Sequence, residues 1–129
     1  MDVADMLGVP PEVYSRDPQQ LIPSLQDYVS KLPLNEFEQS DWVTLHTDLL
    51  FYVADYLIQR HGAHWVVAND PNAPRGYRYV IEAQGRDGQT RRVDPADVVM
   101  TEFNNPPIEI TRMLASAELT LRLTTASAE

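Results

Sequence analysis

The sequence contains no cysteine, which excludes disulfides, thiol nucleophiles and thiolate metal sites together. It also lacks a run of about 18 apolar residues, the length that a membrane-spanning helix needs, so no association with a membrane is expected. The N-terminus carries acidic residues where a secretory signal has a basic start, and it lacks the apolar stretch of such a signal. The absence of a secretory signal predicts a cytoplasmic protein, and the absence of cysteine is compatible with that location.

Glycine is scarce, and its positions exclude the common catalytic loops. The five glycines lie apart, at places where helix caps and turns are expected: Gly8, Gly62, Gly76, Gly85 and Gly88. No phosphate-binding loop, dinucleotide-binding motif or nucleophile elbow is present. The sequence therefore predicts no catalytic residue and no cofactor.

Length and composition predict one folded domain. A chain of 129 residues is long enough to bury a core without disulfides or a metal, and 43% hydrophobic with 22% charged residues is typical of globular proteins. Residues 1–129 are expected to form this domain. Residues 1–16, which include Pro10 and Pro11, are expected to be a loosely attached N-terminal arm.

Charge is unevenly distributed along the chain. The net charge of −9 opposes binding to nucleic acid, even though Tyr77 and Tyr79 suit base stacking and the arginines near them suit phosphate contacts. Residues 1–50 hold nine acidic residues against two basic ones, whereas residues 75–92 hold five arginines against two acids. This asymmetry is either ordinary surface patterning or an electrostatic guide for a basic partner.

Two N-terminal helices are expected. Asp17 followed by Pro18 is typical of a helix start, and this helix runs to about Lys31, with its regular part beginning a turn later because of Pro23. The second helix spans residues 41–61 and ends at Gly62. Its apolar residues recur at helical spacing and predict the core face: Trp42, Leu45, Leu49, Val53, Tyr56 and Leu57.

Three β-rich segments follow, "HWVVA", "YRYVIEA" and "QTRRV", and they predict an antiparallel meander. The stretch "GRDG" between the last two predicts a hairpin, because Asp87-Gly88 tolerates positive φ at both turn positions. One face of the middle strand is expected to pack on the helices, and it comprises Tyr77, Tyr79, Ile81 and Ala83.

The C-terminal segments complete an α+β fold with two N-terminal helices, a three-stranded antiparallel meander and one or two C-terminal helices. Asp94-Pro95 again indicates a helix start, here for "DPADVVMTEF". From Ile108 onward the apolar spacing fits a helix, although Leu119, Leu121 and Leu123 also alternate as in a strand. A helix to about Thr120 is favoured.

Three histidines and two aspartates are the candidate metal-ligating or catalytic residues. His61 and His64 are separated by Gly62, so they do not share a helical face as a zinc-binding pair would, and His46 lies roughly 20 Å from His61 along the helix. His61 is expected to assist the helix C-cap, His64 to begin a strand, and no metal to bind. Two acids on the second helix have the spacing of a glycosidase-like pair but are expected to lie on its solvated face: Asp48 and Asp55.

Partner-binding residues are predicted in two places. The stretch "NDPNAPRGY" is longer than a hairpin needs, so it is either a binding loop or a tolerated insertion, and its candidates are Asp70, Pro71, Asn72 and Arg75. The acidic start of the second helix supplies the others: Glu36, Glu38 and Asp41.

The succession "YVADYLIQRHGAHW", a variable loop and "VDPADVV" resembles small uncharacterised bacterial α+β domains, including immunity proteins of polymorphic toxin systems. The resemblance covers roughly residues 50–100. Such families have no catalytic motif, so the resemblance implies a binding protein.

The leading functional prediction is a non-enzymatic protein-interaction module of the immunity, adaptor or secretion-chaperone type. Its partner is expected to be a protein, with a basic surface favoured by the charge asymmetry, and a homodimer is allowed. The alternative is a small ligand-binding protein or enzyme. Its pocket would lie between the central helix and the sheet and would use Asp48, Asp55 or His64.

Overall fold

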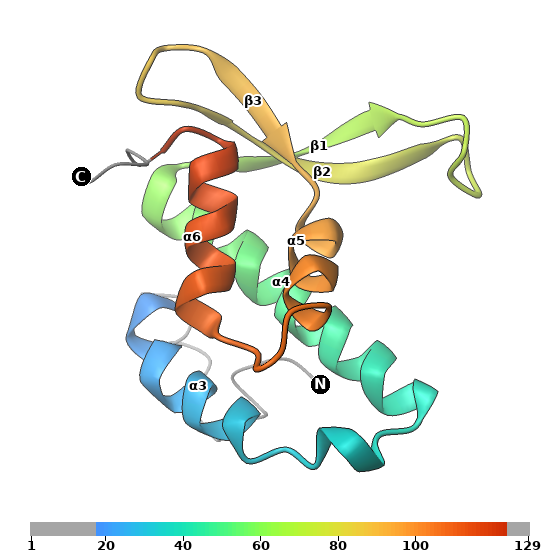
Figure 1. Ribbon diagram of the computed structural model, residues 1–129. Helices are drawn as coiled ribbons and strands as arrows, with labels where there is room; N and C mark the ends of the chain where they lie inside the picture. The colour runs from blue at the N-terminus through green and yellow to red at the C-terminus, as the bar shows by residue number, and fades with distance from the viewer. Residues whose placement is uncertain (1–17, 124–129) are drawn as a thin grey trace.

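The computed structural model describes residues 18–123, so the expected N-terminal arm and the helix cap expected at Asp17 lie outside the described residues. Within this range the fold is α+β, with four α-helices and one antiparallel sheet (Figure 1). In chain order the elements are η1 Pro18–Leu21, α3 Ile22–Ser30, η2 Leu34–Glu36, α4 Gln39–His61, β1 His64–Asn69, β2 Tyr77–Gln84, β3 Thr90–Val93, α5 Pro95–Phe103 and α6 Ile110–Thr120.

Helix α4 begins and ends as its sequence predicts, within two residues. At the start, the Asp41 carboxylate accepts a hydrogen bond of 2.9 Å from the backbone N–H of Glu38, the N-cap residue. At the end, Gly62 adopts the left-handed conformation with φ of 68°, and its N–H donates to the carbonyl of Ile58. These two caps define the ends of the longest helix, which contributes residues to both grooves described below.

The sheet has the strand order β1-β2-β3, which confirms the predicted meander. Val67 pairs with Tyr79, and Ile81 pairs with both Trp65 and Val93. Figure 1 shows the β1–β2 hairpin projecting beyond the helices, whereas the paired part of β3 lies above them. The sheet is therefore covered by helices over only part of its length.

This projection corrects the prediction for the middle strand. Ile81 and Ala83 are buried as expected, but Tyr79 on the same face is 57% exposed. Tyr79 lies nearer the β1–β2 loop than Ile81, and it lines an open groove beside α4. Val80, expected on the open face, is buried. Alternation alone does not show how far a sheet extends past the helices beneath it.

The β2–β3 hairpin forms at "GRDG" as predicted, but its turn differs in detail. Only Gly88 has positive φ, and the Asp87 carboxylate instead accepts from the N–H of Gln89. The backbone N–H of Gly85 donates to the carbonyl of Gln89, closing a wider loop. A Cβ at Gly85 would lie 2.7 Å from the backbone oxygen of Leu121, so this loop packs closely against the end of α6.

Helices α5 and α6 confirm the C-terminal predictions. Asp94 caps α5 by accepting a 2.9 Å hydrogen bond from the N–H of Ala96, and Pro95 occupies the first turn. Helix α6 ends at Thr120, so the alternating leucines after Leu119 do not form a strand. The two helices pack on α4 and on each other, and η1 also contacts α4.

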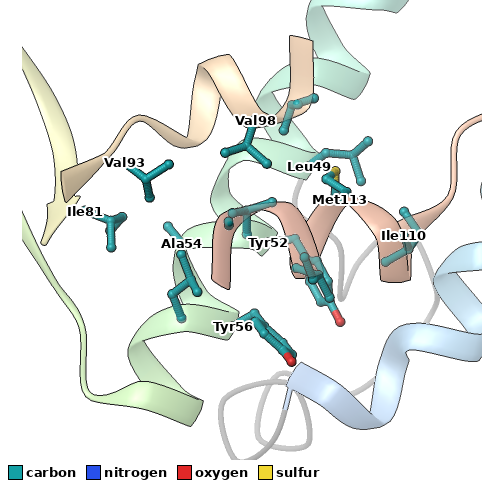
Figure 2. Packing of buried hydrophobic residues seen from close by; sticks show 14 of the residues in the cluster. Leu49, Tyr52, Ala54, Tyr56, Ile81, Val93, Val98, Ile110 and Met113 are labelled. Atoms are coloured by element: carbon teal, nitrogen blue, oxygen red, sulfur yellow. The ribbon is translucent and has the colours of Figure 1, made fainter. Parts of the chain in front are cut away.

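The core lies between α4, α5, α6, α3 and the inner part of the sheet (Figure 2). Leu45, Leu49, Val53, Tyr56 and Leu57 of the predicted face are buried, whereas Trp42 is only half-buried and packs at the edge. Tyr52, which the prediction omitted, is fully buried. The buried face of α4 is therefore wider than its apolar repeat predicts.

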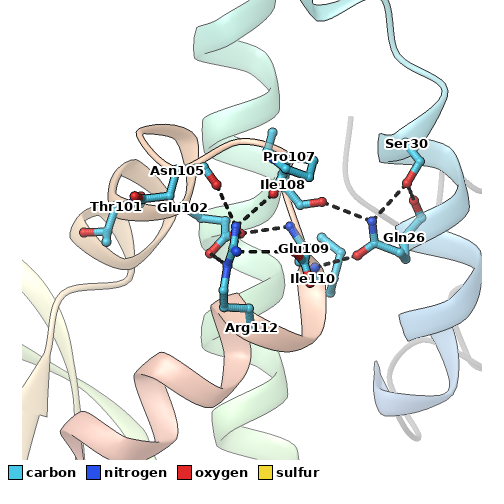
Figure 3. Close-up of polar contacts among 10 residues, drawn as sticks. All are labelled: Gln26, Ser30, Thr101, Glu102, Asn105, Pro107, Ile108, Glu109, Ile110 and Arg112. Carbon is cyan, nitrogen blue, oxygen red and sulfur yellow. Dashed lines mark hydrogen bonds and ion pairs between the residues drawn. The ribbon is translucent and has the colours of Figure 1, made fainter.

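A polar network joins α5, α6 and α3 around the 104–109 connector (Figure 3). The buried Glu102 carboxylate accepts from Arg112 Nη2 at 2.6 Å and from the backbone N–H of Glu109 at 2.9 Å. The Gln26 side chain on α3 accepts from the N–H of Ile110 and donates to the carbonyl of Ile108. Side chains thus satisfy backbone groups that the irregular connector leaves unpaired.

None of the helices in residues 18–123 combines the length and apolar character that crossing a membrane requires.

Candidate functional site

Two open grooves lie beside α4, and the first runs between α4 and α5. It has a volume of about 400 Å³ and a largely apolar lining. Val43 on α4 is 57% exposed and Met100 on α5 is 48% exposed, so large apolar side chains here face solvent. The complete lining is Gln39, Trp42, Val43, His46, Met100, Phe103 and Asn104.

Packed aromatic rings form the floor of the first groove. The Trp42 ring meets Phe37 and Phe103 edge-on, with ring centroids 5.1 Å apart in both pairs. The ring of His46 lies 5.9 Å from that of Phe103, and its Nε2 is 3.1 Å from the carbonyl oxygen of Ala96. Because each ring is held by its neighbours, binding an apolar group in this groove costs little side-chain conformational entropy.

The second groove, of about 520 Å³, lies between α4 and the projecting hairpin. The rings of Phe51 on α4 and Trp65 on β1 are 6.3 Å apart, and Tyr79 on β2 adds a third exposed ring. Arg78 and Asp94 supply its charged edge. The full lining is Leu50, Phe51, Trp65, Arg78, Tyr79, Asp94 and Ala96.

The two grooves lie on the same side of α4, next to α5. Val43 and Leu50 are two helical turns apart and therefore project from the same side of α4. Helix α5 contributes Ala96 to the second groove and Met100 to the first, so it runs antiparallel to α4 along this side. Among the described residues, five of the seven large hydrophobic side chains classed as exposed line the grooves: Val43, Phe51, Trp65, Tyr79 and Met100. We call this surface the α4–α5 face.

The predicted acidic residues lie at one end of the α4–α5 face. Glu36 ends η2, Glu38 is the N-cap of α4, and Asp41 lies in the first turn of α4. All three are exposed, and they flank Gln39, which lines the first groove. An acidic rim therefore borders the apolar groove.

The predicted loop residues lie elsewhere, at the tip of the β1–β2 hairpin, far from the start of α4 in Figure 1. Asp70 orders this loop, because its carboxylate accepts from the N–H of Asn72 at 3.0 Å and its own N–H donates to the carbonyl of Gly76. Pro71, Asn72 and Arg75 are exposed. The two predicted groups thus belong to separate surfaces.

A polar cleft of about 470 Å³ lies on the other side of Arg78, between the sheet, α5 and α6. Arg78 contacts Asp94 at 2.7 Å, Asp97 at 3.5 Å and Asp70 at 3.4 Å, and the charge of Asp94 is the main cause that raises the pKa of Arg78. Three carboxylates already surround this guanidinium. The cleft is therefore a poor site for an anionic ligand.

The histidines have structural contacts that the sequence did not predict. His61 Nε2 lies 2.6 Å from Glu118 on α6, and the Tyr56 hydroxyl donates to the same carboxylate at 3.3 Å. His61 does lie in the last turn of α4, beside the Gly62 cap, and its ring is in addition held across the helix pair by Glu118. His64 does begin β1, and its Nε2 is 3.2 Å from Glu82.

The other predicted chemical groups do not meet in a groove. Asp48 is buried rather than solvated, so its expected position on a polar face is wrong, and Asp55 is half-buried. Neither aspartate lines a groove described above, nor does His64. Within residues 18–123, no three histidine, cysteine or acidic side chains gather closely enough to hold a metal ion.

Sequence reasoning missed the α4–α5 face itself. Val43 and Phe51 are apolar residues outside the predicted core stripe of α4, and that excess of apolar residues was the available signal. A helix that packs on one side alone carries polar residues on the other. Apolar residues on both sides of α4 therefore indicate a second contact surface.

Comparison with known proteins adds no family: no family model matches the chain, and no curated protein or solved structure matches it significantly. The resemblance to immunity-type domains remains a prediction.

Proposed function

We propose that the protein is a non-enzymatic interaction module that binds a partner protein through the α4–α5 face. The observation that carries this proposal is the exposure of Val43, Phe51 and Met100 beside ordered aromatic rings. Exposed apolar surface of this kind is costly in water and is typical of binding sites on soluble proteins. A cytoplasmic immunity protein, adaptor or secretion chaperone fits this role.

The acidic rim supports a partner with a basic edge. Glu36, Glu38 and Asp41 border the apolar groove, and the acids counted in residues 1–50 outnumber bases by nine to two. In protein interfaces, apolar groups at the centre supply most of the affinity, whereas charges at the rim mainly steer association. The hairpin loop from Asp70 to Arg75 is a second, more distant contact in this proposal.

The affinity test uses two matched substitutions. Protein carrying Val43→Lys or Leu119→Lys is compared with the unaltered protein in affinity capture, and the captured polypeptide is then purified and titrated by calorimetry. Leu119 is exposed on α6 and lines neither groove, so its substitution should leave binding unchanged. Val43→Lys should weaken binding at least tenfold, because it places a charge in the centre of the interface.

Two results would contradict the proposal. One is a purified partner that binds the Val43→Lys protein as tightly as the unaltered protein. The other is equal weakening by both substitutions, which would indicate general damage to the fold. Thermal denaturation of both variants separates that damage from loss of contact.

The rim is tested through association kinetics. Replacing Glu36, Glu38 and Asp41 by Gln, Gln and Asn should slow association more than it speeds dissociation, and rising salt should have the same effect. Asp41 also stabilises the start of α4, so the stability of the triple variant is measured separately. An association rate indifferent to both salt and these changes would leave the hairpin loop as the charged contact.

A small-molecule site is the second candidate, and the groove between α4 and the sheet favours it. Its volume of about 520 Å³ lies in the range of ligand pockets, although Asp48, Asp55 and His64 do not line it. Its lining is open and apolar, however, and a flat protein surface covers such a groove better than a small ligand does. A thermal-shift screen against metals and metabolites distinguishes the two candidates, because a ligand that binds the folded protein raises its melting temperature as occupancy increases.

A further inference from the structure

The two edges of the sheet differ in how well they are protected. β3 is four residues long, carries Arg91 and Arg92, and is followed directly by Asp94-Pro95. Short length, charge and proline are the features that keep an edge strand from pairing with another chain. The β3 edge is therefore closed to further strands.

The β1 edge has none of these features. Its six residues, HWVVAN, include no lysine, arginine, acid or proline, and Val67 at its centre is 52% exposed. β1 is a terminal strand of the sheet, and within residues 18–123 no backbone hydrogen bond outside the β1–β2 ladder involves His64–Asn69. In Figure 1 the outer side of β1 faces open space in the projecting hairpin. As far as the described residues go, one row of backbone donors and acceptors on β1 therefore has no partner strand.

We propose that β1 pairs antiparallel with β1 of a second copy, joining two three-stranded sheets into one continuous sheet of a homodimer. A two-fold axis perpendicular to the sheet relates antiparallel copies of one strand, and it keeps Trp65 and Val67 of both copies on the same face. The pairing centres on either Val66 or Val67, since only registers centred on a residue keep opposite side chains on one face. In either register no like-charged side chains within β1 face each other.

A second copy suits the β1 edge because the strand is uncharged and self-compatible. The chain has a net charge of −9, yet β1 itself carries no carboxylate, so two copies meet where neither presents acids. A basic strand would find no acid on β1 to pair with. Dimerisation through the edge also leaves Val43 and Met100, at the other end of the α4–α5 face, for the proposed partner.

The first test is the mass of the purified protein by sedimentation velocity over a wide concentration range. The unaltered protein should dimerise, Val67→Lys should shift the equilibrium at least tenfold toward monomer, and Val43→Lys should leave it unchanged. The two valines have similar exposure, 52% and 57%, which makes them a matched pair. A protein that stays monomeric, or a dimer lost with Val43→Lys instead, overturns the proposal.

The second test exploits the absence of cysteine from the chain. Facing Cα atoms in an antiparallel pair are about 4.5 to 5.5 Å apart, within reach of a disulfide. Under mild oxidation, either Val66→Cys or Val67→Cys should form a covalent dimer much faster than Val43→Cys. Equal rates at all three positions would contradict strand pairing, even if the protein dimerises. Both tests need no partner protein, so their failure is independent of the proposed function.

Discussion

Replacing Leu49 by alanine is the sharpest test of how α4 builds the core. Leu49 is fully buried and belongs to one hydrophobic cluster with Val98 of α5 and Met113 of α6 (Figure 2). Removing a fully buried leucine side chain loses about 1.5 to 3 kcal/mol of transfer free energy, and the remaining cavity adds to this cost. Because helices surround the site, it can collapse only partly, and we expect a loss of about 3 to 4 kcal/mol in the free energy of unfolding.

The assay is urea denaturation followed by circular dichroism, with the slope of the transition checked for constancy. Val43→Ala is the control on the same helix, since Val43 is exposed and its truncation should change stability by less than about 0.5 kcal/mol. If Leu49→Ala destabilises the protein no more than Val43→Ala, the assignment of the buried face of α4 is wrong.

Three further predictions concern capping, pH and metal. Asp94→Ala should lower stability by about 0.5 to 2 kcal/mol in urea denaturation, because Ala96 loses its cap, and Asp94→Asn should restore most of it. The hydrogen bond from Arg92, with a smaller effect from that of His64, lowers the pKa of Glu82 below its ordinary 4.5. The ionised Glu82 therefore stabilises the fold fully above pH 4.5, and this stabilisation is lost as pH falls through the lower pKa of the folded state. Glu82→Gln should accordingly flatten the acid side of a curve of unfolding free energy against pH. Untagged protein and its His64→Ala variant should contain no stoichiometric zinc by atomic spectroscopy, and zinc in the first but not the second would overturn the structural role of His64.

Local signals account for the parts of the fold that the sequence predicted. Gly62, Asp94 and Pro95 act through backbone geometry within a few residues, and each marks a helix end in the structure as expected. The three β-rich segments likewise predicted the antiparallel meander. The hairpin expected at "GRDG" forms, although Gly88 and not Asp87 has positive φ, and the close packing of Gly85 against the end of α6 involves residues too distant in sequence to be predicted.

Contacts between distant elements account for what sequence reasoning missed. The exposure of Tyr79 depends on where the helices stop beneath the hairpin, and the contact of His61 with Glu118 depends on how α6 crosses α4. Neither follows from periodicity. The predicted acidic residues lie beside the first groove. The groove itself is lined by apolar residues outside the predicted core face of α4, such as Val43.

Site-specific photo-cross-linking tests the α4–α5 face most directly. A benzoylphenylalanine placed at Val43, in cells that produce the protein, should yield one discrete adduct upon irradiation, and the same group at Leu119 should not. The adduct should disappear when Met100→Lys is added on the opposite side of the groove, and mass spectrometry should identify a protein with basic residues near the linked site. Absence of any adduct at Val43, or the same adduct from Leu119, would contradict a partner-binding role for this face.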